Sequence, residues 1–393
     1  MNTLSQKINR RVQGLQASST LTITARAKEL KAQGCDVVNF AAGEPDFDTP
    51  LAIKESAIRA IQAGFTKYTP SIGALELRQA ICAKFKKENG LDYSPAQIVV
   101  SCGAKHSLFN IIQVLADEGD EVLIPVPYWV SYPEMVKFAG ATPKFIPTSE
   151  EKGFKITPQQ LSSAINERSR LLILNSPSNP TGAVYTRDEL QAIAALVVEH
   201  DIMVISDEIY EKLIYGDGPY TSIAALNQDV ARLTITVNGV SKAYSMTGWR
   251  IGYCAGPPEI MSYIKKVQDH STSNPCSISQ QAARQALESP ATEVMQMRDE
   301  FRQRRDLLMA GIDEIPGISY IPPQGAFYLF CNVSQLGDAF TVAQRILDEK
   351  HVAMIPGEGF GAPGFVRLSF ATSADRIKEG TRRLAEWVRE NQG

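Results

Sequence analysis

Closely spaced metal ligands and paired cysteines are missing from this sequence of 393 residues. The four histidines and six cysteines are scattered singly: His106, His200, His270 and His351; Cys35, Cys82, Cys102, Cys254, Cys276 and Cys331. Zinc sites and disulfide frameworks show short, paired spacings instead. We therefore expect neither a metal site nor a disulfide scaffold, and the unpaired cysteines favour a reducing compartment.

An excess of one charge and a long apolar run are also lacking. Lysine and arginine number 40 and aspartate and glutamate 43, which gives a formal net charge of −3 and a pI near 5.9. Nucleic-acid binding usually needs a basic excess, and no apolar run approaches the length of a membrane span or the core of a signal peptide. We expect a cytoplasmic protein with neither nucleic-acid nor membrane partners.

What the sequence does contain is a regular alternation of short apolar runs and helical segments. With 44% hydrophobic residues the chain reads as globular, and its length favours two domains. Helical spacing covers 21–34, 51–64, 74–89, 104–116 and 187–200, and strand-like runs cover 98–100, 121–126, 171–174, 203–206 and 233–237. This order predicts an α/β fold with a mostly parallel sheet covered on both faces, in which ligands bind at the carboxyl ends of the strands.

Polar residues follow four of these strands. A small-residue turn that opens a helix, 101–106, is of the kind that holds a phosphate, and Asn179 lies in a turn rich in proline. Asp207 follows a run so apolar that its carboxylate needs a cationic partner. After the fourth strand come Ser241, Lys242 and then Arg250.

Lys242 is the residue around which these signals gather. A desolvated lysine has a lowered pKa and can form a Schiff base with a carbonyl compound. The alternative is a lysine that ends a strand and reaches water. Pyridoxal phosphate requires a lysine for its aldehyde, a carboxylate for its ring nitrogen, and a helix N-terminus with an arginine for its phosphate. The four strand ends supply one candidate for each, so we expect this cofactor.

Several longer motifs carry a resemblance to a known family. They are 43–50 (GEPDFDTP), 128–132 (YWVSY), 179–182 (NPTG), 206–210 (SDEIY) and 246–252 (MTGWRIG). From about residue 21 to 387 the chain resembles the fold-type I pyridoxal-phosphate aminotransferases, most closely bacterial aspartate aminotransferases of the thermophile type. The resemblance implies a large domain with a mostly parallel seven-stranded sheet flanked by helices, plus a smaller α+β domain. It also implies a homodimer with shared active sites.

The resemblance assigns roles to individual residues. Lys242 would bind the cofactor covalently and then transfer a proton, Asp207 would pair with the ring nitrogen, and Tyr210 and Asn179 would contact its phenolic oxygen. The remaining cofactor contacts would be Trp129 on the ring, with Gly103, Ala104, Lys105, Ser241, Arg250 and the partner subunit's Tyr68 around the phosphate. Gly43, Trp129, Asn179, Arg367, Lys105 and Thr20 would bind substrate.

Beyond residue 289 the regular alternation of strands and helices ends. A long helical region, four strand-like runs (318–321, 327–333, 352–355 and 365–370) and a last helix follow. We expect a small domain of residues 1–45 and 289–393 beside a large cofactor-binding domain of 46–288. Arg367 alternates with apolar residues, as an exposed charge on an edge strand does. In the resembling family the matching arginine binds the substrate carboxylate with two parallel hydrogen bonds.

Substrate choice depends on two further positions. In the subgroup that the chain resembles, a lysine at the position of Lys105 binds the second carboxylate of aspartate or glutamate; the alternative is a helix-surface lysine. Thr20 matches a position linked to prephenate as an additional amino acceptor. We expect transfer between aspartate and 2-oxoglutarate. The rivals are an aromatic or alanine-type aminotransferase, a regulatory protein with a DNA-binding region, and a non-catalytic scaffold.

Overall fold

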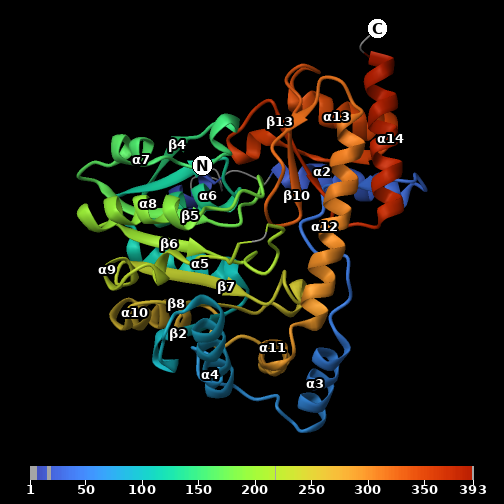
Figure 1. The fold of residues 1–393 in the computed structure, drawn as a ribbon. Coiled ribbons are helices and arrows are strands. Elements are labelled where there is room, and N and C mark those ends of the chain that lie inside the picture. Colours follow the sequence, from blue (N-terminus) through green and yellow to red (C-terminus); the bar gives the residue numbers. More distant parts are fainter. Residues whose placement is uncertain (1–6, 16–18, 217, 392–393) are drawn as a thin grey trace.

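The computed structural model describes residues 7–15, 19–216 and 218–391, without the side chains of 19–22. A large sheet with helices on both faces forms one part of the molecule, and a smaller group of strands lies beside the long helix α12 (Thr292–Asp313) and the last helix α14 (Ala374–Asn391) (Figure 1). The α/β architecture predicted from the alternating pattern is therefore confirmed, including the smaller second domain.

The large sheet has seven strands in the order β2-β8-β7-β6-β5-β3-β4. Their bounds are β2 (Ile98–Ser101), β3 (Glu121–Val126), β4 (Thr142–Pro147), β5 (Ser169–Asn175), β6 (Met203–Asp207), β7 (Thr234–Gly239) and β8 (Gly252–Ala255). Only β8 runs against its neighbours, since it pairs antiparallel with both β2 and β7. Six strands therefore point their carboxyl ends toward the same edge of the sheet.

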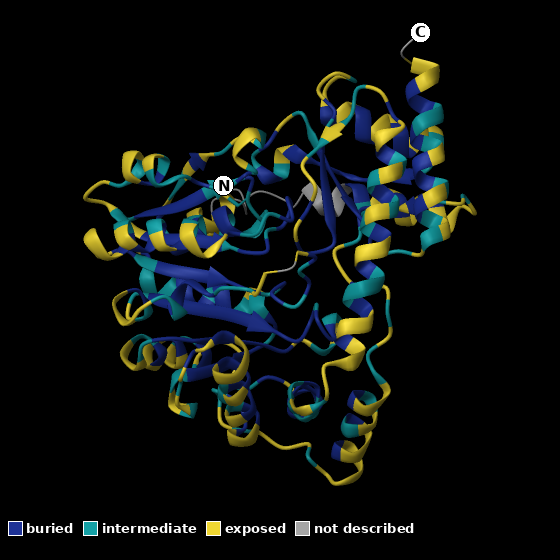
Figure 2. Ribbon diagram, viewed as in Figure 1, coloured by how far each residue is buried: buried dark blue, intermediate teal, exposed yellow. Residues whose placement is uncertain are grey.

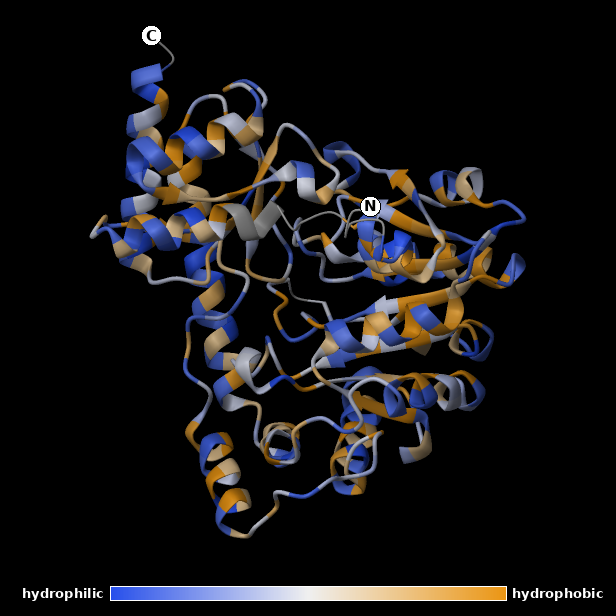
Figure 3. Ribbon diagram, turned by 180° about the vertical axis from the view of Figure 1, so that it is seen from behind, coloured by the Kyte–Doolittle hydropathy of each residue, from blue (hydrophilic) through white to orange (hydrophobic). Residues whose placement is uncertain are grey.

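Helices cover both faces of this sheet because successive strand residues are apolar. Val122 and Ile124 face α5 (Ala104–Leu115), α6 (Ser131–Ala139) and α10 (Pro258–Asp269), while Leu123 faces the opposite side. That side is covered by α7 (Pro158–Ala164) and α8 (Arg187–Glu199), with α9 (Gln228–Ala231) nearby. The strands are buried and the outer helix faces exposed (Figure 2), and the same strands are mostly hydrophobic (Figure 3). Burial on both faces explains near-continuous apolar runs in place of alternation.

Toward the β2 end of the sheet lie three more helices, α3 (Leu51–Gln62), α4 (Leu75–Lys84) and α11 (Ser277–Glu288). The sequence predicts one helix over 74–89, but the α-helix ends at Lys84 and a π-helical turn, Phe85–Asn89, completes the segment. The left-handed Gly90, with φ of 69°, then ends it. The predicted helix is therefore correct in extent and wrong in its last turn.

The small domain is built on a four-stranded antiparallel sheet in the order β12-β13-β10-β9. Its strands are β9 (Ser319–Tyr320), β10 (Tyr328–Asn332), β12 (Ile355–Pro356) and β13 (Phe365–Ser369), and a separate parallel pair joins β1 (Val38–Asn39) to β11 (Val352–Ala353). Helices α2 (Ser19–Ala32) and α13 (Ala339–Lys350) complete the domain, and the short α1 (Arg10–Gln13) lies near α6.

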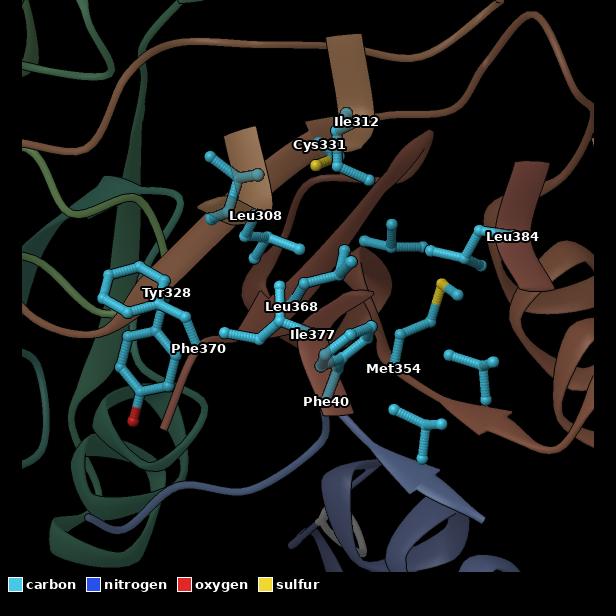
Figure 4. Close-up of a cluster of buried hydrophobic side chains, with 14 of the residues drawn as sticks. Phe40, Leu308, Ile312, Tyr328, Cys331, Met354, Leu368, Phe370, Ile377 and Leu384 are labelled. Carbon is cyan, nitrogen blue, oxygen red and sulfur yellow. The ribbon is translucent and has the colours of Figure 1, made fainter. Parts of the chain in front are cut away.

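One apolar cluster holds the small domain together. Phe40, from the start of the chain, packs with Leu308 of α12, Leu368 of β13 and Leu384 of α14 (Figure 4). Val294 and Met297, in the first turns of α12, instead pack with the helices around β2. Helix α12 therefore contributes to both cores. Across the described ranges no helix combines the length and apolarity of a membrane span.

Candidate active site

The sequence-predicted residues meet at one edge of the large sheet. Strands β2, β5, β6 and β7 end there, and the antiparallel β8 begins there, since Gly252 pairs with both Ser101 and Gly239. A cavity of ≈ 430 Å³ opens at this edge. Its lining includes eleven of the predicted residues: Gly43, Ala104, Lys105, Trp129, Asn179, Asp207, Tyr210, Ser241, Lys242, Arg250 and Arg367.

Lys242 reaches into the cavity from the turn that follows β7. Its Nζ donates a 2.6 Å hydrogen bond to the main-chain oxygen of Gly43, and the rings of Tyr210 and Phe327 lie 5.9 and 5.8 Å from it. Burial lowers the pKa of Lys242 from 10.5 to about 8, although the charge of Glu44 opposes that shift. A substantial fraction of neutral amine is thus available near neutral pH, as a nucleophile requires.

Asp207 ends β6 and is almost completely buried, with 4% of its surface exposed. Burial raises its pKa from 3.8 to about 6, while hydrogen bonds from the Tyr132 hydroxyl and from the main-chain N–H of Ile209 lower it. At neutral pH the site therefore holds a largely ionised carboxylate in an apolar setting. A cationic ring nitrogen is the partner that such a carboxylate would stabilise.

One side of the cavity is formed by tight backbone packing around Arg250. This residue adopts a left-handed conformation, with φ of 56°, and donates to the main-chain oxygens of Thr247 and Cys102 at 2.9 and 3.3 Å. A Cβ on Gly103 would lie 2.4 Å from Nη2 of Arg250, and one on Gly252 would lie 2.1 Å from the nitrogen of Ala104. Only glycine fits at these positions. The N-terminus of α5 and the guanidinium thus form an anion site.

Arg367 does not lie on an edge strand, because β13 pairs with β12 on one side and β10 on the other. Its Nη1 donates to Oδ1 of Asn179 at 3.0 Å and its Nη2 to the oxygen of Ala41 at 3.2 Å. The guanidinium carbon lies 4.2 Å from the ring centroid of Tyr328, while its Nε has no hydrogen-bond partner in the described structure. The interpretation as a surface charge is therefore wrong for this arginine.

Two aromatic residues complete the walls. Trp129 packs edge-on against Tyr132, and Nζ of Lys105 lies 4.9 Å from the centroid of the indole. Burial and the nearby charge of Arg250 lower the pKa of Lys105. Lys105 is among the residues that line the cavity, and it is exposed in the first turn of α5.

Three predicted residues are placed elsewhere. Gly103 packs against Arg250 and Tyr68 is 92% exposed, and neither is among the residues that line the cavity. Thr20 lies in α2, and its side chain falls outside the part that the structure describes. A partner subunit would be needed for Tyr68 to reach a cavity.

Four residues of the cavity lining are not predicted from the sequence: Tyr132, Tyr328, Glu44 and Thr247. Tyr328 shares a 3.0 Å hydrogen bond with Tyr210, and Thr247 donates to Glu44 at 2.7 Å. Tyrosines in apolar runs are usually core residues, so only the fold reveals that these two turn toward the cavity.

A lysine, a buried carboxylate and an anion-binding helix end at one edge of a parallel sheet define a pyridoxal-phosphate-dependent enzyme. Residues 35–384 match the family model described as "Aminotransferase class I and II". The chain is 50% identical over 390 residues to an aspartate aminotransferase of Geobacillus stearothermophilus, covering 97% of this chain and 99% of that one. It is 45% identical over 392 residues to an aspartate/prephenate aminotransferase of Nitrosomonas europaea, with 96% and 99% coverage.

A solved structure agrees with these matches. The aspartate aminotransferase of Thermus thermophilus with maleate superposes with a TM-score of 0.94 at 44% identity, covering 98% of this chain and 100% of that chain. The chain therefore belongs to the class I and II aminotransferases, enzymes that depend on pyridoxal phosphate.

The residues present fit this cofactor. The cavity supplies an amine of lowered pKa, a buried carboxylate and an arginine beside a helix N-terminus, and the glycines allow the Arg250 guanidinium and the start of α5 to pack closely. Within the described ranges, no group of three or more histidine, cysteine, aspartate or glutamate side chains is arranged to hold a metal ion. The donor set is thus that of an organic phosphate cofactor.

Proposed function

We propose that this chain transfers the amino group of aspartate to 2-oxoglutarate, giving oxaloacetate and glutamate. The observation that carries the proposal is the pair of cationic groups in one cavity, Arg367 and Lys105. A dicarboxylic substrate needs a partner for each carboxylate, and the cavity supplies two that lie on different elements, β13 and α5. The names of the relatives at 45–50% identity support the same substrate class.

Bound pyridoxal phosphate supplies the aldehyde that accepts the amino group and a ring that withdraws electrons from the substrate. Lys242 provides the amine that holds the cofactor, and its Nζ then takes and returns the proton of the substrate's α-carbon. Asp207 keeps the ring nitrogen protonated, and Tyr132 holds the Asp207 carboxylate in place through the 2.6 Å hydrogen bond. Tyr210 and Asn179 would contact the phenolic oxygen of the cofactor, and Trp129 would pack on its ring.

The phosphate is bound by Ser241, Arg250 and the turn Gly103-Ala104-Lys105. The α-carboxylate of the substrate is bound by Arg367, whose Nε and Nη2 form a planar fork. Asn179 already accepts from Nη1, which orients the fork, and Gly43 offers backbone contact opposite. An arginine exposed on an edge strand would not have its guanidinium held in one orientation in this way.

We also propose a homodimer in which each site is completed by the partner subunit's Tyr68. Two features support this assembly. Tyr68 is 92% exposed, and α3, just before it in the chain, exposes three large apolar side chains, Leu51 at 62%, Ile58 at 51% and Ile61 at 54%. Several exposed apolar side chains on one helix are a feature of protein interfaces. Light scattering after size exclusion tests it: a mass of 43.1 kDa at micromolar concentration would contradict the dimer.

The domain bounds, the cellular location and a second amino acceptor also belong to this proposal. The large domain would comprise residues 46–288 and the small domain 1–45 with 289–393, with α12 connecting them. Arg367 comes from the small domain and Lys242 from the large one, so substrate binding would close the domains and exclude water. The enzyme would work in the cytoplasm, and prephenate is the second acceptor to test.

The testing experiment is a visible absorbance spectrum of the purified holoenzyme before and after addition of aspartate, glutamate or alanine. Conversion of the bound cofactor to its amine form by aspartate and glutamate, with little response to alanine, is the expected result. A response to alanine greater than that to aspartate would instead assign an alanine-type enzyme, and a greater response to phenylalanine, added as a further donor, would assign an aromatic one. A spectrum unchanged by all donors would refute the proposed activity.

A further inference from the structure

Directly behind the active site lies a cluster of buried charged and polar side chains that the chemistry described above does not use. We call Lys84, Asn89, Glu208 and Glu211 the rear cluster. Their exposed fractions are 6%, 8%, 0% and 8%. Charged side chains are rarely buried to this extent, because desolvation costs several kcal/mol for each. A feature this costly calls for a functional reason.

The rear cluster and the site share one short segment of chain. In Asp207-Glu208-Ile209-Tyr210-Glu211, Asp207 and Tyr210 line the cavity, whereas Glu208 and Glu211 belong to the rear cluster. The segment leaves β6 and turns, so its two sets of side chains point in opposite directions. Because the rear carboxylates and the two cavity residues alternate along one short segment, a shift of its main chain would move both sets.

Hydrogen bonds connect both rear carboxylates to one asparagine. Nδ2 of Asn89 donates to Glu211 at 2.6 Å and, more weakly, to Glu208 at 3.4 Å, while its Oδ1 accepts from Lys84 at 2.7 Å. Lys84 also forms an ion pair with Glu211. Glu208 receives two further hydrogen bonds, from the hydroxyls of Ser206 at 2.8 Å and Ser222 at 2.6 Å. The segment is thus anchored on its rear side from three parts of the chain.

The π-helical turn explains how Asn89 and Lys84 come together. They are five residues apart, and in an α-helix such positions point about 140° away from each other. The Phe85–Asn89 turn follows i→i+5 geometry instead, which places the two side chains within 2.7 Å. Single π-turns are rare and occur mainly at functional sites.

We propose that the rear cluster is a positioning device for the active site. It fixes the segment from Asp207 to Tyr210 so that the carboxylate and the phenol keep the orientation that the bound cofactor needs. Asn89, Glu208 and Glu211 act only through these two residues and do not touch cofactor or substrate. This inference rests on the cofactor being bound at Asp207, as the family requires.

The experiment compares three variants of the holoenzyme. Asn89→Ala removes the hydrogen bonds of Asn89 with Lys84 and with both carboxylates but leaves the direct Lys84–Glu211 ion pair, and Ser222→Ala removes one hydrogen bond to Glu208 while leaving every charge in place. The matched control is Asn166→Ala: Asn166 donates at 2.9 Å to Glu121, another buried carboxylate with lysine and arginine partners, at the opposite edge of the same sheet. All three variants lose a hydrogen bond to a buried carboxylate, but only the first two lie behind Asp207.

We expect Asn89→Ala to lower kcat about ten-fold with KM for aspartate changed less than two-fold, because misplaced groups slow the chemical step more than binding. We expect the same variant to shift the pH midpoint of the visible absorbance of the bound cofactor and to weaken its binding about five-fold. Ser222→Ala should show the same three effects to a smaller degree. Asn166→Ala should leave kcat, the absorbance midpoint and cofactor binding unchanged. The absorbance and the cofactor affinity are measured without substrate. They therefore test the positioning role of the rear cluster even if aspartate is not the amino donor.

The result that overturns the inference is an equal loss of unfolding stability in all three variants, with kcat, absorbance and cofactor affinity unchanged. The rear cluster would then be a purely structural set of buried charges. Should Asn89→Ala fail to fold, Ser222→Ala decides alone, since it keeps all charges and deletes a single oxygen. A normal absorbance midpoint and normal kcat in that variant also reject the positioning role.

Discussion

The hydroxyl of Tyr132, on α6, donates a 2.6 Å hydrogen bond to Oδ2 of Asp207, at the end of β6. Both side chains are almost completely buried, and the hydrogen bond lowers the pKa of Asp207 against the opposing effect of burial. The charged form of the Asp207 carboxylate, which lines the cavity, therefore depends on a residue from a different strand–helix unit.

Replacement of this tyrosine tests the dependence. Tyr132→Phe should raise the pKa of Asp207 further and lower kcat/KM for aspartate about ten-fold, because a hydrogen bond to a charged group contributes about 1.5–3 kcal/mol. Steady-state kinetics measure the effect. Tyr185→Phe is the control, since Tyr185 is also a buried tyrosine and accepts from the Ile156 N–H at 3.0 Å, away from Asp207. A loss of equal size in both variants would show a general packing effect.

Asp207 itself gives a prediction about stability. Its folded pKa of about 6 lies above the ordinary 3.8, so between these pH values the folded protein retains a proton that the unfolded chain has released. Stability contributed by Asp207 is thus complete below pH 4 and is lost as the pH rises through 6. Above pH 6 the buried charge should cost the cofactor-free protein about 2–3 kcal/mol.

Asp207→Asn should therefore stabilise the cofactor-free protein while it abolishes most activity. Asparagine keeps the size of the side chain and an oxygen for the Tyr132 hydroxyl, but it carries no charge. Denaturant unfolding at pH 7.5 should give a larger free energy of unfolding than for the wild type, and the difference should disappear near pH 3.5. A less stable variant at pH 7.5 would mean that burial does not strain this carboxylate.

The sequence alone was sufficient for much of this site, for a physical reason. Polar residues that follow apolar strands in an α/β pattern must collect at one edge of the sheet, so Asp207, Lys242 and Asn179 could be placed together without coordinates. Arg250 joins them only because β8 is antiparallel, which periodicity does not reveal. The resemblance to aminotransferases, rather than spacing, assigned Arg367 to the cavity.

What the sequence did not reveal lies in local exceptions. Strand β4 was missed because Pro143 and Pro147 interrupt its pattern, and an edge position allows them. The π-turn at the end of α4 was invisible because helical propensity does not distinguish i+4 from i+5 winding. Tyr132 and Tyr328 have the sequence pattern of core residues. The cavity lies inside the fold, so residues that line it are buried like the core.

Replacement of Lys242 should cause the largest loss of activity. Lys242→Ala should lose the pH-dependent visible absorbance of the bound cofactor and lower turnover by about four orders of magnitude, since it removes both the covalent attachment and the proton-transferring amine. Lys242→Arg should be equally inactive although it keeps a positive charge, because a guanidinium does not form an imine under these conditions. Absorbance and single-turnover rates with aspartate measure both. Activity within ten-fold of the wild type in either variant would refute the role of this lysine.

Lys105 gives a prediction about the substrate class. It lines the cavity with its Nζ 4.9 Å from the centroid of Trp129, on a different element from Arg367, so we expect it to bind the second carboxylate of a dicarboxylic substrate. Lys105→Ala should lower kcat/KM about 100-fold for aspartate and less than three-fold for alanine, because one charge pair worth about 2–3 kcal/mol is removed from the first substrate only. Lys137→Ala, which breaks the α6 pair with Glu134 at 2.9 Å, should affect neither. Equal losses of kcat/KM for aspartate and alanine, together with weaker cofactor binding, would instead show that the Lys105 side chain binds the cofactor phosphate. The cofactor is common to both reactions, so both would then slow equally.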